Sequence, residues 1–339
     1  MLHVAINGYG RIGRLVHRQF CNRFSNDVHV VGINASSNAE MRAYLLKYDS
    51  LHGRFDGEIS VASDAELLVN GRPVRVVKER DPAKCPWREL GVDVVVESTG
   101  NFETREEVSA HLQAGAKRVI VTAPMKDNTP TFVKGVNDQG LKPEYDIISN
   151  ASCTTNCIAP VIKAIDEAFG VENLLVSSVH AFTATQNLLD NKPKEGGELR
   201  RARAAMLSMI PTKTGAVSAC AVIFPHLKGK IDGMAFRVPI PTVSCASMAF
   251  FLKRTTDVKE VHEALIAASK TPAMHGILDV SFDQCVSIDF QTDPHSSIVD
   301  APSTKVVDGR AAQILSWYDN EWGYAMRVTE MTVKLGSFL

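Results

Sequence analysis

The chain of 339 residues lacks the features that identify several common classes of protein. No apolar run is long enough to cross a bilayer, and the formal net charge of −1 gives no strong basic excess for binding nucleic acid or a membrane surface. The first strand is expected to begin at Leu2, which leaves no room for a signal peptide before it. We therefore expect a cytoplasmic protein that binds neither nucleic acid nor membranes.

Paired cysteines are also missing. The seven cysteines are an odd number and mostly scattered, which is typical of reduced thiols rather than of a disulfide framework. Cys153 and Cys157 have the wrong spacing for a thioredoxin-like pair, and no second cysteine pair accompanies them as a structural zinc site requires. The sequence therefore predicts neither disulfides nor a bound metal.

The length and the composition, 45% hydrophobic and 22% charged, are typical of a globular protein with two domains. In the first 150 residues, strand patterns at 2–7 and 27–34 flank a helical pattern at 11–20, and further strands and helices alternate behind them. Asn70-Gly71 predicts a β-hairpin inside this region. We predict an α/β, doubly wound sheet with a β insertion.

From residue 151 onwards, long β stretches predict a largely antiparallel sheet with helices on one face. Helices are expected at 152–169, at about 258–270 and over the residues from Asn320 onwards. The β stretches are expected at 174–184, 233–240, 244–254, 286–290 and 303–318. The polar stretch 190–198 is expected to be an exposed loop.

A glycine-rich turn, Gly8-Tyr9-Gly10-Arg11-Ile12-Gly13, joins the first strand to the first helix. Its glycines allow the backbone to turn tightly and to approach a pyrophosphate, and the helix N-terminus supplies N–H groups and a positive dipole end. A structural glycine turn in another kind of α/β protein is the alternative at this point.

The second strand ends without the acidic residue that normally binds the adenosine ribose. Its tip reads Asn34-Ala35-Ser36-Ser37, so no carboxylate repels a 2′-phosphate, and the hydroxyls of Ser36 and Ser37 are available to bind one. We hypothesise that NADP is accepted beside NAD, or even preferred. The alternative is that Ala35 merely weakens the binding of NAD.

A thiol stands at the predicted start of the helix 152–169. Ser152 is a suitable N-cap, and Cys153 then falls in the first turn, where the helix dipole favours a thiolate. Cys157 lies one turn further along and is expected to be buried and inert. A buried structural role is the alternative for Cys153, and for His180, the histidine best placed to act as its base.

Taken together, these stretches resemble the phosphorylating (type I) glyceraldehyde-3-phosphate dehydrogenases. Seven motifs carry the resemblance and keep the family's order from end to end: 6–13, 149–157, 180–186, 200–203, 211–216, 237–241 and 317–324. The resemblance implies a Rossmann-type dinucleotide-binding domain over 1–151 and an α+β catalytic domain over 152–319. It further implies that the helix 320–339 packs back on the first domain, and that the protein is a homotetramer.

The resemblance also implies a role for individual residues. Cys153 is the expected nucleophile and His180 the expected general base. The residues expected to bind the triose phosphate and inorganic phosphate are Ser152, Thr154, Thr183, Arg201, Thr214, Gly215 and Arg237. Those expected to bind NAD or NADP are Gly8, Gly10, Arg11, Ile12, Gly13, Asn34, Ala35, Arg80, Thr122 and Asn320, with Tyr324 close by.

Two departures from the family pattern favour NADP. Ala35 replaces the usual acidic residue, and the loop 190–198, with Lys192 and Lys194, is longer than usual. In the family, this loop can touch the adenosine end of a neighbouring subunit's cofactor. Members with a neutral strand tip often work in the reductive, gluconeogenic direction rather than in glycolysis.

Three other functions are alternatives to this one. The nearest is D-erythrose-4-phosphate dehydrogenase, which shares the glycine turn, the thiol and much of the last motif. A catalytically silent nucleotide-binding regulator would not need both Cys153 and His180. A Cys–His hydrolase would not need the glycine turn.

Overall fold

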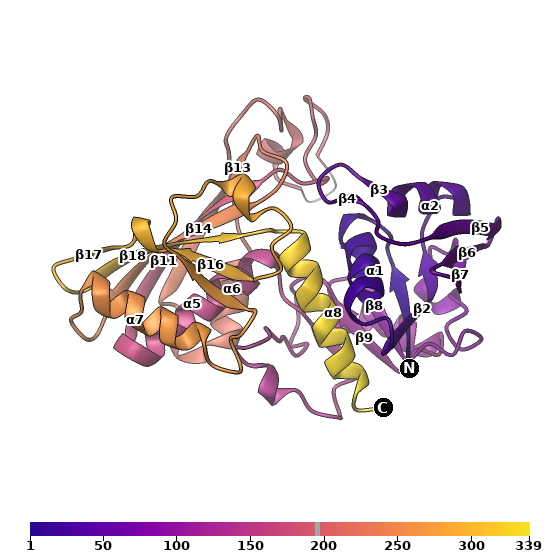
Figure 1. The fold of residues 1–339 in the computed structure, drawn as a ribbon, viewed down its shortest axis with the longest axis horizontal. Coiled ribbons are helices and arrows are strands. Elements are labelled where there is room, and N and C mark those ends of the chain that lie inside the picture. The colour runs from indigo at the N-terminus through magenta and orange to yellow at the C-terminus, as the bar shows by residue number, and fades with distance from the viewer. Residues whose placement is uncertain (194–196) are drawn as a thin grey trace. The chain divides into compact units, whose positions relative to one another are not determined.

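The computed structural model describes residues 1–193 and 197–339, which fold into two compact units (Figure 1). The first unit comprises Met1–Phe132, Asp138–Ala151 and Ala325–Leu339, and the second comprises Val133–Asn137 and Ser152–Tyr324. No helix among the described residues combines the length and the apolar character that a membrane span requires.

The first unit contains an eight-stranded sheet in the order β10-β9-β8-β1-β2-β7-β6-β5. The strands from β10 to β7 run parallel, and β6 and β5 form the antiparallel insertion at one edge. Their bounds are Leu2–Asn7 (β1), Val28–Asn34 (β2), Ile59–Ser63 (β5), Glu66–Val69 (β6), Arg72–Val77 (β7), Val94–Glu97 (β8), Arg118–Val121 (β9) and Ile147–Ser149 (β10). A small separate pair is formed by Tyr48–Asp49 (β3) and Gly53–Arg54 (β4). This confirms the predicted doubly wound sheet, whose strand order is that of dinucleotide-binding sheets.

Two helices of the first unit, α2 and α3, begin where the sequence supplies side-chain caps. Asn38 accepts a hydrogen bond from the Met41 N–H at the start of α2, and Thr104 and Glu107 form the capping box of α3. The helix bounds of this unit are Arg11–Arg23 (α1), Ala39–Lys47 (α2), Arg105–Val108 (α3) and Ala110–Gln113 (α4). Trp322–Gly336 (α8) belongs to this unit from Ala325 onwards.

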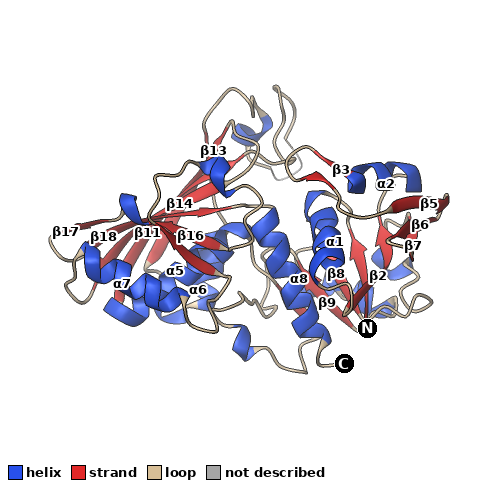
Figure 2. Cartoon of the chain, in the orientation of Figure 1, coloured by secondary structure: helices blue, strands red, loops and turns tan. Residues whose placement is uncertain are grey.

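The second unit contains a mostly antiparallel sheet in the order β12-β13-β11-β14-β18-β16-β15, with β17 paired to β18. Helices α5, α6 and α7 pack against one another and against this sheet (Figure 2). The strand bounds are Val171–Ala181 (β11), Ile210–Thr212 (β12), Ile231–Val238 (β13), Ser244–Leu252 (β14), Leu278–Ser281 (β15), Ser297–Asp300 (β16), Lys305–Val307 (β17) and Ala311–Tyr318 (β18). The helix bounds are Cys153–Phe169 (α5), Ala216–Ile223 (α6) and Val258–Ser269 (α7). The predicted α+β class is therefore confirmed.

Two expectations for this unit were wrong. The stretch 286–290 is not a strand, because Ser287–Phe290 forms a short 3-10 helix. The prediction also missed α6, whose sequence is apolar nearly throughout and has no side-chain cap at Gly215, so it lacks the helical signals of period and cap. In the predicted loop 190–198, residues Asp190–Lys192 are exposed, whereas Lys194 lies outside the described residues.

Candidate active site

The glycine turn joins β1 to α1 in a conformation that only glycine adopts easily. Gly8 has a φ of +91°, and a Cβ on it would lie 2.6 Å from the Thr99 nitrogen. A Cβ on Gly13 would lie 2.2 Å from the Gly8 oxygen. No side chain caps α1 at Gly10, as expected of a helix end that binds an anion.

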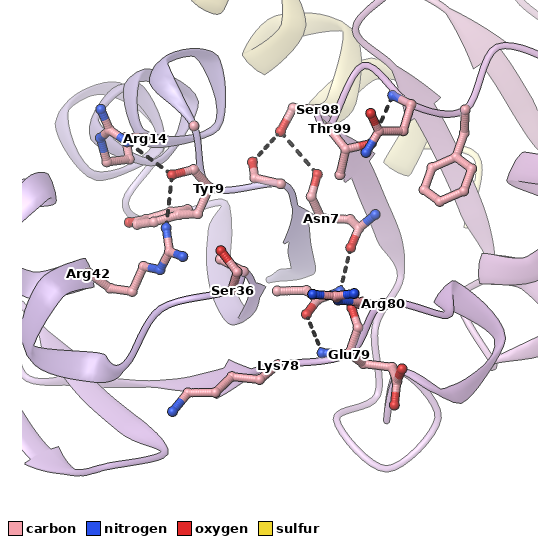
Figure 3. Close-up of a pocket in the computed structure, with 16 residues that line it drawn as sticks. Asn7, Tyr9, Arg14, Ser36, Arg42, Lys78, Glu79, Arg80, Ser98 and Thr99 are labelled. Atoms are coloured by element: carbon pink, nitrogen blue, oxygen red, sulfur yellow. Dashed lines mark hydrogen bonds between the residues drawn. The ribbon is translucent and has the colours of Figure 1, made fainter. Parts of the chain in front are cut away.

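A pocket of about 760 Å³ lies at the ends of β1, β2, β7 and β8 (Figure 3). It lies where the strand order reverses, which is where doubly wound sheets bind nucleotides. Five predicted cofactor residues line it, namely Gly8, Gly10, Asn34, Ala35 and Arg80. The sequence did not single out other lining residues, namely Arg14, Arg42, Lys78, Ser98, Thr99 and Phe102.

The remaining predicted cofactor residues lie elsewhere. Arg11, Ile12 and Gly13 form the first turn of α1, Thr122 follows β9, and Asn320 belongs to the second unit. Both terminal nitrogens of Arg11 bond the Asp49 carboxylate, at 2.9 and 3.0 Å. Burial alone would raise the pKa of Asp49, but the bonds from Arg11 and two backbone N–H groups hold it at about 2. The Arg11 side chain is therefore anchored to the protein.

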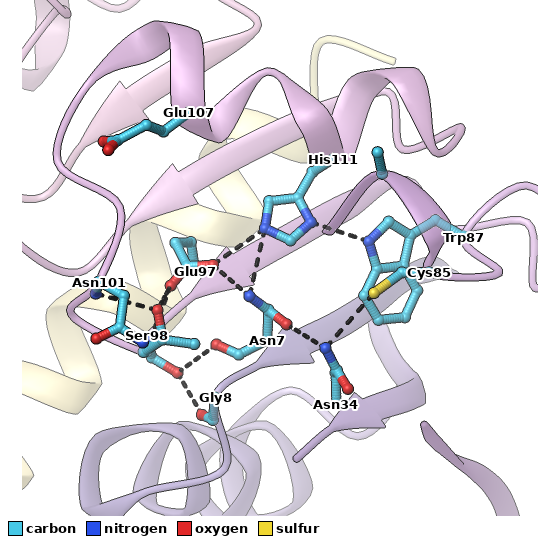
Figure 4. A network of polar contacts seen from close by, with 12 residues as sticks. Asn7, Gly8, Asn34, Cys85, Trp87, Glu97, Ser98, Asn101, Glu107 and His111 are labelled. Atoms are coloured by element: carbon cyan, nitrogen blue, oxygen red, sulfur yellow. Dashed lines mark hydrogen bonds and ion pairs between the residues drawn. The ribbon is translucent and has the colours of Figure 1, made fainter. Parts of the chain in front are cut away.

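A buried polar network supports the floor of the pocket (Figure 4). The Trp87 Nε1–H donates to His111 Nδ1 at 3.0 Å, so the other ring nitrogen carries the proton and donates to Glu97 at 3.0 Å. Glu97 also accepts hydrogen bonds from the Asn7 amide and the Thr99 N–H. With these donors, Glu97 is a fully bonded carboxylate in an otherwise apolar core.

The same network holds Asn34 at the tip of β2. Its amide nitrogen donates to Asn7 Oδ1 and to the Glu79 carbonyl, both at 2.7 Å, and its oxygen accepts from the Glu79 N–H at 2.9 Å. Its side chain is therefore bonded to protein rather than directed at a ligand. It positions the loop that carries Arg80 into the pocket.

The predicted thiol lies at the start of α5 in the second unit. Ser152 is the N-cap as predicted, since its hydroxyl accepts a hydrogen bond from the Thr155 N–H at 3.1 Å. Ala151 just before it has a φ of +54°, an uncommon conformation for alanine that turns the chain sharply. Cys153 is half-buried, whereas Cys157 is fully buried and its pKa is raised by burial. This agrees with the prediction that Cys157 is inert.

Cys153 and His180 are in contact, with 3.5 Å between Sγ and Nε2. His180 Nδ1 lies 2.7 Å from the carbonyl oxygen of Ala181, which can only accept, and 2.8 Å from Arg237 Nη1, which can only donate, so the two contacts favour opposite tautomers of the ring. Arg237 Nη1 also donates to the Ala181 oxygen at 3.0 Å. In the tautomer that carries its proton on Nδ1, Nε2 presents its lone pair to the sulfur.

Strand register explains why these groups meet. His180 on β11 pairs directly with Arg237 on the parallel strand β13, so both side chains project from the same face. Burial raises the pKa of the Cys153 thiol, whereas Arg237 opposes this by lowering it. Burial, assisted by Arg237, lowers the pKa of His180 to about 3. The expected thiolate is thus not favoured in the unliganded chain, where the pair is neutral, because burial outweighs the helix end.

Two predicted phosphate-binding arginines, both half-buried, lie together here. Burial lowers the pKa of both Arg201 and Arg237; Glu198 opposes this at Arg201, whereas Arg201 lowers the pKa of Arg237 further. Among the described residues, no carboxylate forms an ion pair with either guanidinium. Arg201 donates to the Thr185 hydroxyl at 3.0 Å, which lies 2.9 Å from that of Thr183. Such a pair of partly buried cations favours the binding of an anion.

Other predicted residues extend this region. The Thr154 hydroxyl is bonded to the buried Tyr318 hydroxyl at 2.9 Å, and Tyr318 packs edge-on against His180. Thr214 and Gly215 directly precede α6. Asn320 accepts at Oδ1 a hydrogen bond from Ser244, at 2.9 Å, which leaves its amide nitrogen as a donor.

Comparison with known proteins gives consistent matches along the chain. The family model described as "Glyceraldehyde 3-phosphate dehydrogenase, NAD binding domain" matches residues 2–105, and that described as "Glyceraldehyde 3-phosphate dehydrogenase, C-terminal domain" matches residues 152–320. Glyceraldehyde-3-phosphate dehydrogenase 2 of Bacillus subtilis is 49% identical over 97% of this chain and 95% of its own. Glyceraldehyde-3-phosphate dehydrogenases of Bacteroides fragilis and Geobacillus stearothermophilus are each 47% identical over 98% of both chains.

Proposed function

The chain belongs to the glyceraldehyde-3-phosphate dehydrogenase family, and we propose that Cys153 and His180 carry out its reaction. That reaction is the reversible oxidative phosphorylation of D-glyceraldehyde 3-phosphate to 1,3-bisphosphoglycerate. The observation that carries the proposal is the contact of 3.5 Å between the Cys153 sulfur and His180 Nε2, beside two half-buried arginines that form no ion pair among the described residues. The names of the relatives favour the triose phosphate over erythrose 4-phosphate.

In the first half of the reaction, the Cys153 sulfur attacks the aldehyde carbon and forms a hemithioacetal. His180 Nε2 removes the hydroxyl proton of this adduct as hydride leaves its carbon, which yields a thioester on Cys153. The oxidised nicotinamide supplies the acceptor for the hydride. His180 is suited to this step because its lowered pKa keeps the imidazole neutral at neutral pH.

In the second half, inorganic phosphate attacks the thioester carbon and the Cys153 thiolate departs, which releases the acyl phosphate. We assign the binding of the two phosphate groups to Arg201 and Arg237 together with hydroxyl and backbone N–H donors. These donors are contributed by Ser152, Thr154, Thr183, Thr214 and Gly215. Each of these hydroxyls already has a protein partner. Those of Ser152 and Thr154 are bonded to the Thr155 N–H and to the buried Tyr318, so these two residues contribute chiefly to the position of the turn around Cys153.

The residues of the first unit fit a dinucleotide. Gly8 and Gly13 leave no space for a Cβ against the protein backbone, which keeps the turn tight, whereas Gly10 has open space beside it where a pyrophosphate can approach the start of α1. The pocket around Asn34, Ala35 and Arg80 receives the adenosine half of the cofactor. We assign the nicotinamide carboxamide to Asn320, whose orientation Ser244 holds.

Within this function we propose a preference for NADP, and with it the reductive, gluconeogenic direction. At the tip of β2 the pocket is lined by Ala35 and Ser36, neither of which carries a carboxylate. Four cationic side chains also line the pocket, namely Arg14, Arg42, Lys78 and Arg80. A 2′-phosphate therefore meets attraction where a carboxylate would repel it. The Ser37 hydroxyl is buried and does not line the pocket, so this proposal rests on Ser36.

We also propose that the chain forms a homotetramer. Leu175 on β11, Met234 on β13 and Phe251 on β14 are exposed on the face of the second sheet that the helices leave open. A second copy would cover these apolar side chains. The free state of all seven cysteines is consistent with a reducing cytoplasm.

Steady-state kinetics with both aldose phosphates and both cofactors test the proposal. We expect phosphate-dependent oxidation of the triose phosphate, and a loss of about 10³-fold in kcat for Cys153→Ser, since a hydroxyl is a much weaker nucleophile. Cys21→Ser, which changes a half-buried thiol of the first unit, is the matched control. Faster turnover of erythrose 4-phosphate would contradict the substrate, and full activity of Cys153→Ser would contradict the mechanism.

A further inference from the structure

Arg42 is a buried cation on the wall of the nucleotide pocket (Figure 3). It belongs to the first turn of α2 and is only 7% exposed. Within the described part of the chain, its one side-chain hydrogen bond is a long contact of 3.4 Å from Nη1 to the Tyr9 carbonyl, and its buried Nε has no partner. The guanidinium therefore has donors that these residues do not satisfy.

The electrostatic surroundings of Arg42 are unfavourable for a cation. Arg14 donates to the same Tyr9 carbonyl at 3.0 Å, and both burial and Arg14 lower the pKa of Arg42. Lys78 and Arg80 line the same pocket, where Glu79 is the one carboxylate among the lining residues. Glu79 accepts a hydrogen bond from the Asp81 N–H at 2.9 Å, so it is held within its own loop. Arg42 thus lacks a counter-ion among the residues that the structure describes.

The position of Arg42 indicates which anion would complete the site. The N-terminus of α1 serves the pyrophosphate, which NAD and NADP share. Arg42 instead follows the tip of β2, where the ribose 2′ position is read and where an arginine accommodates a 2′-phosphate. Ser36, on the loop between β2 and α2, lines the pocket with an exposed hydroxyl. A phosphate monoester here would receive charged donors from one side and a hydroxyl from the other.

We propose that Arg42, with Ser36, binds the 2′-phosphate of NADP and determines the preference for that cofactor. This rests on the proposed function, since it names the residue that reads the cofactor. Removal of the guanidinium removes the interactions made with the 2′-phosphate and, within the protein, the long contact with the Tyr9 carbonyl. NAD, which has a hydroxyl at that position, gains nothing from Arg42.

The binding of two fragments tests the proposal without catalysis. Calorimetry measures the affinities of adenosine 2′,5′-bisphosphate and of adenosine 5′-monophosphate for the wild type, for Arg42→Met and for Lys47→Met. Lys47 is exposed at the far end of the same helix, so Lys47→Met removes the same charge outside the pocket. We expect the wild type and Lys47→Met to bind the bisphosphate at least tenfold more tightly than the monophosphate. We expect Arg42→Met to lose most of this difference, and Ser36→Ala to lose a smaller part.

Kinetics then separate this inference from the proposed function. In Arg42→Met, kcat/KM should fall at least tenfold with NADP and stay within about twofold with NAD, which also shows that the variant is folded. An equal loss with both cofactors would mean that Arg42 binds a phosphate common to both, and would overturn the inference. A wild type that binds the two fragments equally would overturn it as well, while NAD-dependent oxidation of the triose phosphate would still establish the enzyme.

Discussion

The strongest quantitative prediction concerns the charge of His180. Burial lowers its pKa from 6.5 to about 3, so the folded chain holds the imidazole neutral where an unfolded chain would protonate it. Stability from this group is therefore fully present above pH 6.5 and is lost as the pH falls towards 3. At pH 5 the loss of folding stability is about 2 kcal/mol, because pH 5 lies 1.5 units below 6.5 and each unit costs about 1.4 kcal/mol. This figure depends little on the folded pKa, provided that it lies well below 5.

His180→Asn isolates this contribution. The asparagine amide can still donate to the Ala181 carbonyl, as Nδ1 does, but it does not titrate. Urea unfolding of both proteins at pH 8 and pH 5 should give a drop in free energy that is about 2 kcal/mol smaller in the variant. The other buried histidine with a lowered pKa, His17, is common to both proteins and cancels. Equal drops would refute the assignment of His180 as a base that is neutral before substrate binds.

Three substitutions test the supporting contacts. Tyr318→Phe removes the hydroxyl bonds to Thr154 and Ser178, and should lower the free energy of unfolding by about 1–2 kcal/mol in urea denaturation; an unchanged midpoint would argue against these bonds. Ser244→Ala releases the orientation of the Asn320 amide, and should raise KM for the cofactor severalfold with a smaller change in kcat; a fall in kcat alone would contradict this role. Trp87→Phe removes the donor to His111 Nδ1, and should lower the free energy of unfolding by about 1–3 kcal/mol in urea denaturation. An unfolded variant, or one with unchanged stability, would contradict this role of the hydrogen bond.

The fold could be predicted from the sequence largely because its signals are local. The period of apolar residues defines β1, α1 and β2, and Asn70-Gly71 specifies the hairpin between β6 and β7. Ser152 was identified as a cap by its residue type and position. By contrast, α6 has neither a helical period of apolar residues nor a side-chain cap, and its packing against β13 and α5 is what favours a helix there.

The site was predictable only in part, because long-range pairing creates most of it. The Cys-centred motif indicated the proposed nucleophile, but the contact between Cys153 and His180 depends on how β11 lies against α5. The ion pair of Arg11 with Asp49 joins residues 38 apart, so no local pattern indicates that the Arg11 side chain is already engaged. Arg42 belongs to no sequence motif. Its proposed role depends on its burial and on the lack of a counter-ion among the described residues, which no sequence pattern indicates.

Arg237 reconciles two requirements that the reaction places on one small volume. In the proposed mechanism, Cys153 must become an anion while the adjacent His180 stays neutral. Burial opposes the ionisation of Cys153, and the contact between the two groups would otherwise favour a proton shared between them. The positive charge of Arg237 lowers the pKa of Cys153 and of His180 alike, so it favours the thiolate and disfavours the imidazolium at once. A phosphate group bound to this guanidinium offsets part of its charge, which raises the basicity of Nε2 when the substrate is in place. The same cation therefore keeps the base unprotonated while the site is empty and allows it to accept the proton once the substrate has arrived.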